Sequence, residues 1–154
     1  MAATISELLE RYAKLDKNTL YRIAKNAINN FKNDEPDPVK RHQIVAILIQ
    51  RIAYTGDVEP TYQEYEFFNA ISGFKRNSFK EFEHYCSKSS QAYDTEMKLY
   101  KYIMTNWSTK GRVALLQIGL CLCAIDRISP FEPSYMRGIF PWEVISAHDQ
   151  YAQM

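Results

Sequence analysis

The chain is short of the residues that break helices or cross-link small folds. It has only five glycines, six prolines and three cysteines among 154 residues. No segment alternates apolar and polar residues between Asn-Gly or Asp-Gly turns, so strands and hairpins are not indicated. Three cysteines without regular spacing do not make a disulfide framework, which fits a reducing, cytoplasmic location. The fold is therefore predicted to be all-α.

Long apolar runs and an excess of charge are also missing. The most apolar run, residues 113–125, has thirteen residues, whereas a membrane-spanning helix needs about 20. The N-terminal segment carries charges every few positions, unlike a signal peptide. Nineteen basic and 18 acidic residues give a formal net charge of +1, so no bulk field attracts a polyanion or an anionic membrane. Membrane insertion and general nucleic-acid binding are not expected.

Apolar and aromatic residues at helical spacing are abundant instead. Hydrophobic residues make up 46% of the chain and aromatic residues 14%, enough for residues 1–154 to form one domain without a metal or disulfide. Periodicity and capping signals predict a bundle of about eight helices. Residues 44–54 and 113–125 are apolar around more than half of a helix surface. We expect both segments to be central helices that pack against each other.

Several residues are predicted to mark helix ends. In a capping box, a Ser or Thr side chain accepts a hydrogen bond from the third helical amide, and an acid at that third position reaches back. Four pairs have this spacing: Thr4 with Glu7, Thr61 with Glu64, Ser78 with Glu81, and Ser129 with Glu132. Gly73 stands where a helix commonly ends in the left-handed conformation.

Two stretches of the chain follow one plan. Residues 43–68 and 114–140 each contain a wide apolar helix, an alanine, a polar turn with an aspartate, and an aromatic-bearing helix. Ala53 and Ala124 occupy the same place in this plan, about 70 residues apart. The repeat predicts two helical hairpins in a pseudo-symmetric arrangement at the core of the bundle.

The second copy of the plan carries a family resemblance. Its turn, AIDRISPFE at 124–132, resembles the signature of the tellurite-resistance TerB-like domain, with Arg127 where that family usually has glycine. The first copy, AYTGDVEP at 53–60, inverts the Asp-Gly order. The resemblance covers residues 38–145 and implies a helical fold with two such hairpins. The N-terminal helix pair, residues 4–32, is then an addition to the family core.

The resemblance implies a function as well. Family members are associated with divalent cations such as calcium and with stress-response and membrane-linked complexes. Matching positions place cation ligands at Asp126 and Glu132, with Asp57 and Glu64 as weaker counterparts. The residues themselves favour helix capping, because calcium takes about six to eight oxygen ligands and this turn offers two carboxylates beside Arg127. Each cap contributes on the order of 1 kcal/mol, which explains the same residues without a ligand.

No convergent set of catalytic or zinc-binding residues is visible in the sequence. His42, His84 and His148 are not at local ligand spacing to another histidine or cysteine, and Cys121 and Cys123 face different sides of a helix. Phosphate loops, nucleophile elbows and the HExxH motif are absent from the sequence. The chain is therefore predicted to be non-enzymatic.

Two surface hypotheses remain. Residues 73–82 interleave Lys75, Arg76 and Lys80 with two phenylalanines, a pattern that single-stranded nucleic acid can contact, although a solvated loop with its phenylalanines in the core is the interpretation that we favour. Tyrosine is enriched at interfaces, and seven tyrosines lie close together in sequence: Tyr54, Tyr62, Tyr65, Tyr85, Tyr93, Tyr100 and Tyr102. The favoured hypothesis is an interaction or regulatory module that binds another protein or a second copy through an aromatic and acidic surface around the hairpin turns.

Overall fold

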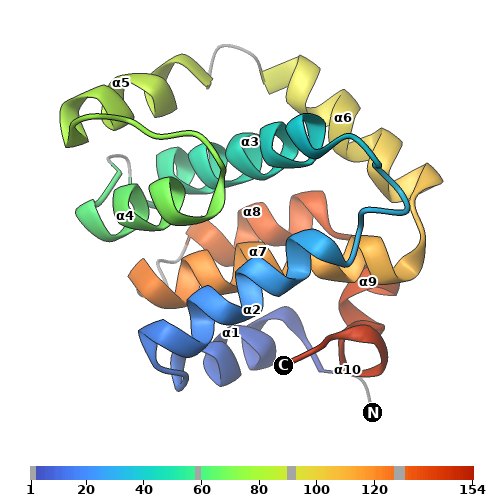
Figure 1. Cartoon of the computed structure of the whole chain (residues 1–154). Helices are drawn as coiled ribbons and strands as arrows, with labels where there is room; N and C mark the ends of the chain where they lie inside the picture. The colour runs from blue at the N-terminus through green and yellow to red at the C-terminus, as the bar shows by residue number, and fades with distance from the viewer. Residues whose placement is uncertain (1–2, 58–59, 90–92, 127–130) are drawn as a thin grey trace.

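The computed structural model describes residues 3–57, 60–89, 93–126 and 131–154, without the side chains of 55–57, 89, 93, 126 and 131–133. These ranges contain ten helices and no strand (Figure 1), which confirms the all-α prediction. The helices are α1 (Ile5–Ala13), α2 (Lys17–Asn29), α3 (Pro38–Asp57), α4 (Tyr62–Ile71), α5 (Phe79–Ser89), α6 (Tyr93–Asn106), α7 (Thr109–Asp126), α8 (Phe131–Ile139), α9 (Trp142–Ser146) and α10 (His148–Tyr151). None of the helices in these ranges is long and apolar enough to cross a membrane.

The predicted helix ends are largely confirmed. Complete capping boxes start α1, from Thr4 and Glu7, and α4, from Thr61 and Glu64. At the start of α5, the Ser78 hydroxyl accepts a hydrogen bond from the Glu81 amide at 3.1 Å, but the Glu81 carboxylate accepts from the Asn77 amide instead of the Ser78 amide. The box predicted at Ser129 and Glu132 lies outside the described residues.

The prediction of about eight helices was low because the C-terminal region contains two short helices. Within residues 141–152, α9 ends at Ser146 and α10 begins at His148. Ala147 serves as the end of one and the start of the other. The break lets His148 turn toward α1, where it is buried.

Helices α3 and α7 form the centre of the bundle and pack against each other, as predicted. The second helix of each hairpin crosses to the first helix of the other hairpin: α8 packs on α3, and α4 packs on α7. The helix after each hairpin returns to the first helix of its own hairpin: α5 packs on α3, and α9 packs on α7. A Cβ atom on Gly119 of α7 would lie 2.8 Å from Met136 of α8 and 3.4 Å from Ile52 of α3, so glycine permits this close packing.

The two central helices differ in how they are covered. Helices α1, α2, α9 and α10 all pack against α7, and residues 113–123 are buried without exception. In Figure 1, α1 and α2 lie on the α7 side of the molecule, and α5 and α6 lie on the α3 side. The N-terminal pair therefore completes the cover of α7, and part of α3 stays at the surface.

Candidate functional site

The structure places the predicted cation ligands at the ends of the hairpin helices. Asp57 is the last residue of α3, Asp126 is the last residue of α7, and Glu132 lies in the first turn of α8; the side chains of these three lie outside the described residues. Glu64 is fully buried, and its Oε1 accepts a hydrogen bond from the Thr61 amide at 2.9 Å. Within the part of the chain that the structure describes, no group of three His, Cys, Asp or Glu residues could hold a metal ion.

The three predicted basic residues between α4 and α5 have different environments. Lys75 and Lys80 are exposed, whereas Arg76 is half-buried. The Arg76 guanidinium lies over the ring of Tyr85, with its Cζ 3.8 Å from the ring centroid. This cation–π contact turns Arg76 toward α5, away from the position of a freely solvated side chain.

The backbone of Arg76 is fixed from both sides by α4. Its amide donates to Asn69 Oδ1 at 2.9 Å, and its carbonyl accepts from Asn69 Nδ2 at 3.3 Å. The same carbonyl accepts from the Tyr65 hydroxyl at 3.1 Å. A connection held by three side-chain hydrogen bonds loses little further freedom when a ligand binds beside it.

Tyr85 is held in turn by a layer of aromatic side chains between α4 and α5. The ring centroids of Phe68 and Tyr85 are 5.5 Å apart, and those of Phe68 and Phe82 are 5.3 Å apart. Tyr65 continues the layer, with its centroid 5.8 Å from that of Phe82. Tilted aromatic pairs at these distances contribute roughly 0.5–1.5 kcal/mol each beyond area burial. Arg76 therefore rests on a rigid support.

A groove runs between this support and α3. It has a volume of about 370 Å3 and is lined by Gln43, Ala46, Ile47, Phe74, Arg76 and Tyr85; we call it the α3 groove. Gly73 follows the end of α4 and has a φ of +80°. This value confirms the prediction that Gly73 ends α4 in the left-handed conformation. A Cβ atom on Gly73 would lie 2.7 Å from the His42 ring, so the connection lies directly against α3.

The matching surface of α7 is closed. When Ala53 is aligned with Ala124, the three α3 residues of the groove correspond to Ala114, Gln117 and Ile118. On α7, the Gln117 Nε2 donates to the Tyr12 hydroxyl and to the Gln153 carbonyl, both at 3.2 Å. Helix α1 and the C-terminal residues therefore cover Gln117, the α7 counterpart of Ala46, and Ala114 and Ile118 are buried as well.

The cover of α7 contains a polar network that sequence reasoning did not find. The Tyr12 hydroxyl is 2.7 Å from His148 Nε2, and His148 Nδ1 is 2.9 Å from Asp149 Oδ1. Arg11 pairs with the Asp149 carboxylate at 2.7 and 3.2 Å. Burial lowers the pKa of His148 below its usual range, and hydrogen bonds from Arg11 and His148 lower the pKa of Asp149 to about 2. Tyr12 is fully buried, so the network fastens the C-terminal region to α1.

A buried ion pair between α3 and α6 was also missed. Arg51 Nε is 3.1 Å from Glu96 Oε2 of α6, with the two side chains 7% and 5% exposed. The Arg51 guanidinium lies 6.0 Å from the centroid of the Tyr135 ring. Burial raises the pKa of Glu96 to about 7, although the charge of Arg51 acts in the opposite direction.

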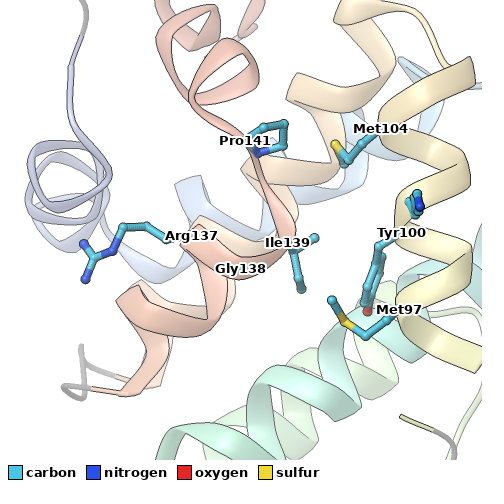
Figure 2. A pocket seen from close by; sticks show the side chains of 8 residues that line it. Met97, Tyr100, Met104, Arg137, Gly138, Ile139 and Pro141 are labelled. Carbon is cyan, nitrogen blue, oxygen red and sulfur yellow. The ribbon is translucent and has the colours of Figure 1, made fainter. Parts of the chain in front are cut away.

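A second cavity of about 300 Å3 lies between α6 and the C-terminal end of α8. Met97, Tyr100, Met104, Ile139 and Pro141 form most of its lining (Figure 2). Arg137 also belongs to the lining, but Figure 2 shows its side chain pointing away from the others. Its charged lining residues, Lys101 and Arg137, are exposed, whereas Arg76 of the α3 groove is held on Tyr85, so this cavity is the weaker candidate site.

The predicted tyrosine surface is only partly present. Tyr62 and Tyr102 are 55% and 60% exposed, and Tyr100 is buried. Tyr54, Tyr65 and Tyr85 are half-buried. The side chain of Tyr93 lies outside the described residues. The tyrosines therefore divide between the surface, the rim of the core and its interior.

No known family model matches the chain. Neither a curated protein nor a solved structure matches it significantly. The geometry of the α3 groove and its surroundings is therefore the basis for a functional proposal.

Proposed function

We propose that this chain is a non-enzymatic protein-interaction module that docks a partner in the α3 groove. The observation that supports this proposal best is the difference in burial between equivalent surfaces of α3 and α7. Ile47 lines the groove and is half-buried, whereas its counterpart on α7, Ile118, is fully buried under other helices.

The composition and rigidity of the groove support a docking role. Its walls present Phe74, Arg76 and Tyr85 over a floor of Ala46 and Ile47. Aromatic residues and arginine are enriched at interfaces and among the residues that contribute most to affinity. Because α4 holds the Arg76 backbone and the aromatic layer holds Tyr85, these walls are arranged before a partner arrives.

The wider role is proposed from the family resemblance. A TerB-like domain in the cytoplasm would act within a stress-response complex, with a divalent cation such as calcium at Asp57, Asp126 and Glu132. Loss of a calcium-dependent rise in melting temperature in Asp126→Ala with Glu132→Ala would support that cation role. No shift in the wild-type melting temperature with calcium would remove it from the proposal.

Nucleic acid is the alternative partner for the same region, because Lys75 and Lys80 are exposed beside the groove. Arg76 argues against it, since its guanidinium lies on Tyr85 and the overall charge is only +1. Binding to mixed oligonucleotides that weakens steeply with salt would favour this alternative, because phosphate contacts release counterions.

Photo-crosslinking in the native host tests the proposal. A photoreactive amino acid at position 47 is compared with one at position 150, which is exposed on α10. We expect a protein that crosslinks from position 47 alone and can be identified by mass spectrometry. The purified partner should bind the wild-type chain and Ile47→Leu, but not Ile47→Asp.

Two results would contradict the proposal. One is crosslinking that is absent at position 47 or equal at both positions. The other is a purified partner that binds Ile47→Asp as tightly as wild type. Circular dichroism of each variant verifies that the helices are intact.

A further inference from the structure

We infer that the α3 groove recognises an acidic amphipathic helix, with one carboxylate of the partner paired to Arg76. This inference rests on the proposed docking function and specifies the chemistry of the partner. Three features of the groove carry it: the placement of one guanidinium, the charge of the neighbouring segment, and the way the equivalent surface of α7 is covered.

Arg76 is arranged as a carboxylate anchor. A guanidinium that stacks on an aromatic ring keeps its donor edge available, and its planar fork matches a carboxylate with two parallel hydrogen bonds. The Arg76 Nε–H is buried and has no hydrogen-bond acceptor among the described residues. Because this Nε atom has almost no accessible surface, a carboxylate beside Phe74 and Tyr85 would pair with the terminal nitrogens of the guanidinium at the edge of the apolar groove.

The segment that forms this wall has a net positive charge. Residues 73–82 contain Lys75, Arg76 and Lys80 and one acid, Glu81, whose carboxylate accepts a hydrogen bond from the Asn77 amide. Both lysines are exposed. Exposed charges of one sign speed the approach of an oppositely charged partner and select against like-charged partners more than they add affinity. The rim therefore favours a partner segment with net negative charge.

The α7 side indicates that the partner segment is helical. There, the equivalent surface is covered by α1, an amphipathic helix that buries Ile5, Leu8, Leu9 and Tyr12. Tyr12 of that helix lies on Gln117, whose counterpart on α3 is the smaller Ala46. Ala46 is 2% exposed and forms part of the floor of the groove, so an anchor from outside the domain would lie above it.

The size of the groove agrees with a helix that lies across it. A volume of about 370 Å3 is within the range of about 300–1,000 Å3 typical of ligand sites, which is enough for anchor side chains and too small for a whole helix. In helix-in-groove recognition the anchors recur at positions three or four apart. Apolar anchors would reach Ala46 and Ile47, and an acid one turn away would meet Arg76.

Fluorescence anisotropy with a pair of labelled peptides tests the inference. The acidic probe is a peptide of about 16 residues, long enough to form a helix, with Phe and Leu four positions apart and Glu three positions before each. The neutral probe has Gln in place of both Glu residues. At low salt we expect the acidic probe to bind at least about tenfold more tightly, as for a charge-assisted pair.

Variants of the protein assign the difference to one side chain. Arg76→Gln should reduce binding of the acidic probe to the level of the neutral probe, and Arg76→Lys should retain only part of the difference. Arg22→Gln is the matched control, because Arg22 is exposed on α2, and should change neither affinity. Lys75→Glu with Lys80→Glu changes two exposed residues only, and should weaken binding of the acidic probe even if Arg76→Gln folds poorly.

The remaining outcomes separate this inference from the proposed function. Equal binding of both probes, abolished by Ile47→Asp, would overturn the carboxylate preference and leave the docking groove intact. No binding of either probe at millimolar concentration would overturn the inference. The crosslinking experiment at position 47 would then decide the docking function alone.

Discussion

Ile47 of α3 and Ile118 of α7 occupy the same place in the repeated plan, yet Ile118 is fully buried and Ile47 lines an open groove. The difference arises outside the two helices. Helix α1 and the C-terminal residues cover α7 through Tyr12 and Gln117, whereas the connection before α5 stops short of covering α3. Helices added to one half of a pseudo-symmetric core can therefore leave the equivalent surface of the other half available for binding.

The two helices differ in a second equivalent pair. Arg51 of α3 corresponds to Leu122 of α7. Leu122 lies in the apolar core, whereas Arg51 needs Glu96 of α6 as a buried partner. Burying charged groups costs desolvation free energy, so the Arg51–Glu96 pair stabilises the fold less than a leucine at the same place would.

The largest expected effect comes from copying the α7 residue onto α3. Above pH 7, where the Glu96 carboxyl of the wild-type chain is ionised, Arg51→Leu alone leaves Glu96 buried without its cation and should lower the free energy of unfolding by about 3–5 kcal/mol. Arg51→Leu with Glu96→Leu should restore most of that loss. Urea unfolding of the single and double variants measures both values; equal losses in the two variants would contradict the assignment of the penalty to an unpaired buried charge.

A matched truncation tests the difference in burial directly. Ile118→Ala should cost about 2–5 kcal/mol, the range for emptying a fully packed core site. Ile47→Ala should cost less than half as much, because solvent already reaches that side chain. Chemical denaturation of both variants decides the matter, and similar losses would mean that the α3 groove is closed in solution.

The two halves should respond to pH in opposite directions. Burial lowers the pKa of His148 below its usual value near 6.5, so the folded chain binds this proton less readily than the unfolded chain. As pH falls below about 6.5, the unfolded chain takes up the proton first, so the free energy of unfolding decreases. In His148→Gln, the free energy of unfolding should fall less steeply with decreasing pH on this acidic limb of the stability profile. A limb that persists unchanged in that variant would exclude His148 as its source.

Glu96 changes the free energy of unfolding with pH in the opposite direction to His148. Its pKa is raised from 4.5 to about 7, so between these values the folded chain keeps a proton that the unfolded chain releases. The free energy of unfolding should therefore decrease as pH rises from about 4.5 to about 7, by at most about 3 kcal/mol. Because the effects of His148 and Glu96 partly cancel, thermal melts of Glu96→Gln should show a steeper acidic limb than wild type. An unchanged profile would contradict the shift.

The smallest effect on stability is expected in the wall of the groove. Phe74 is 37% exposed, so Phe74→Ala should lower the free energy of unfolding by less than about 1.5 kcal/mol, below the cost at a buried phenylalanine. The same variant should weaken binding of the acidic helical probe severalfold. Calorimetric melting and anisotropy measure the two effects separately, and a large stability loss without a binding loss would make Phe74 a core residue.

Local signals in the sequence predicted most of the secondary structure. Capping boxes at Thr4 and Thr61 and the left-handed turn at Gly73 depend on residues a few positions apart, so the chain itself displays them. The wide apolar surfaces of 44–54 and 113–125 predicted their central positions in the same way. Hydrophobic periodicity identifies an apolar surface that is to be buried, but it does not identify the element that covers it.

The polar interactions around the site were not predictable, because they join distant parts of the chain. Tyr12 and His148 are 136 positions apart, and nothing near either residue signals the other. Arg51 sits in the middle of an apolar helix, where sequence alone does not show the Glu96 partner. The sequence displays the basic segment, but the stacking of Arg76 on Tyr85, which makes Arg76 a candidate anchor, depends on how α5 returns to α3.

Chemical-shift mapping with the acidic helical probe tests the central claim most directly. In a titration of the labelled protein, the largest backbone amide shifts should fall at Ala46, Ile47, Phe74, Arg76 and Tyr85, which line the α3 groove. The equivalent α7 residues Gln117 and Ile118 should not shift. Shifts centred on the cavity between α6 and α8, or an absence of shifts at saturating probe, would contradict the claim that the open surface of α3 is a docking surface.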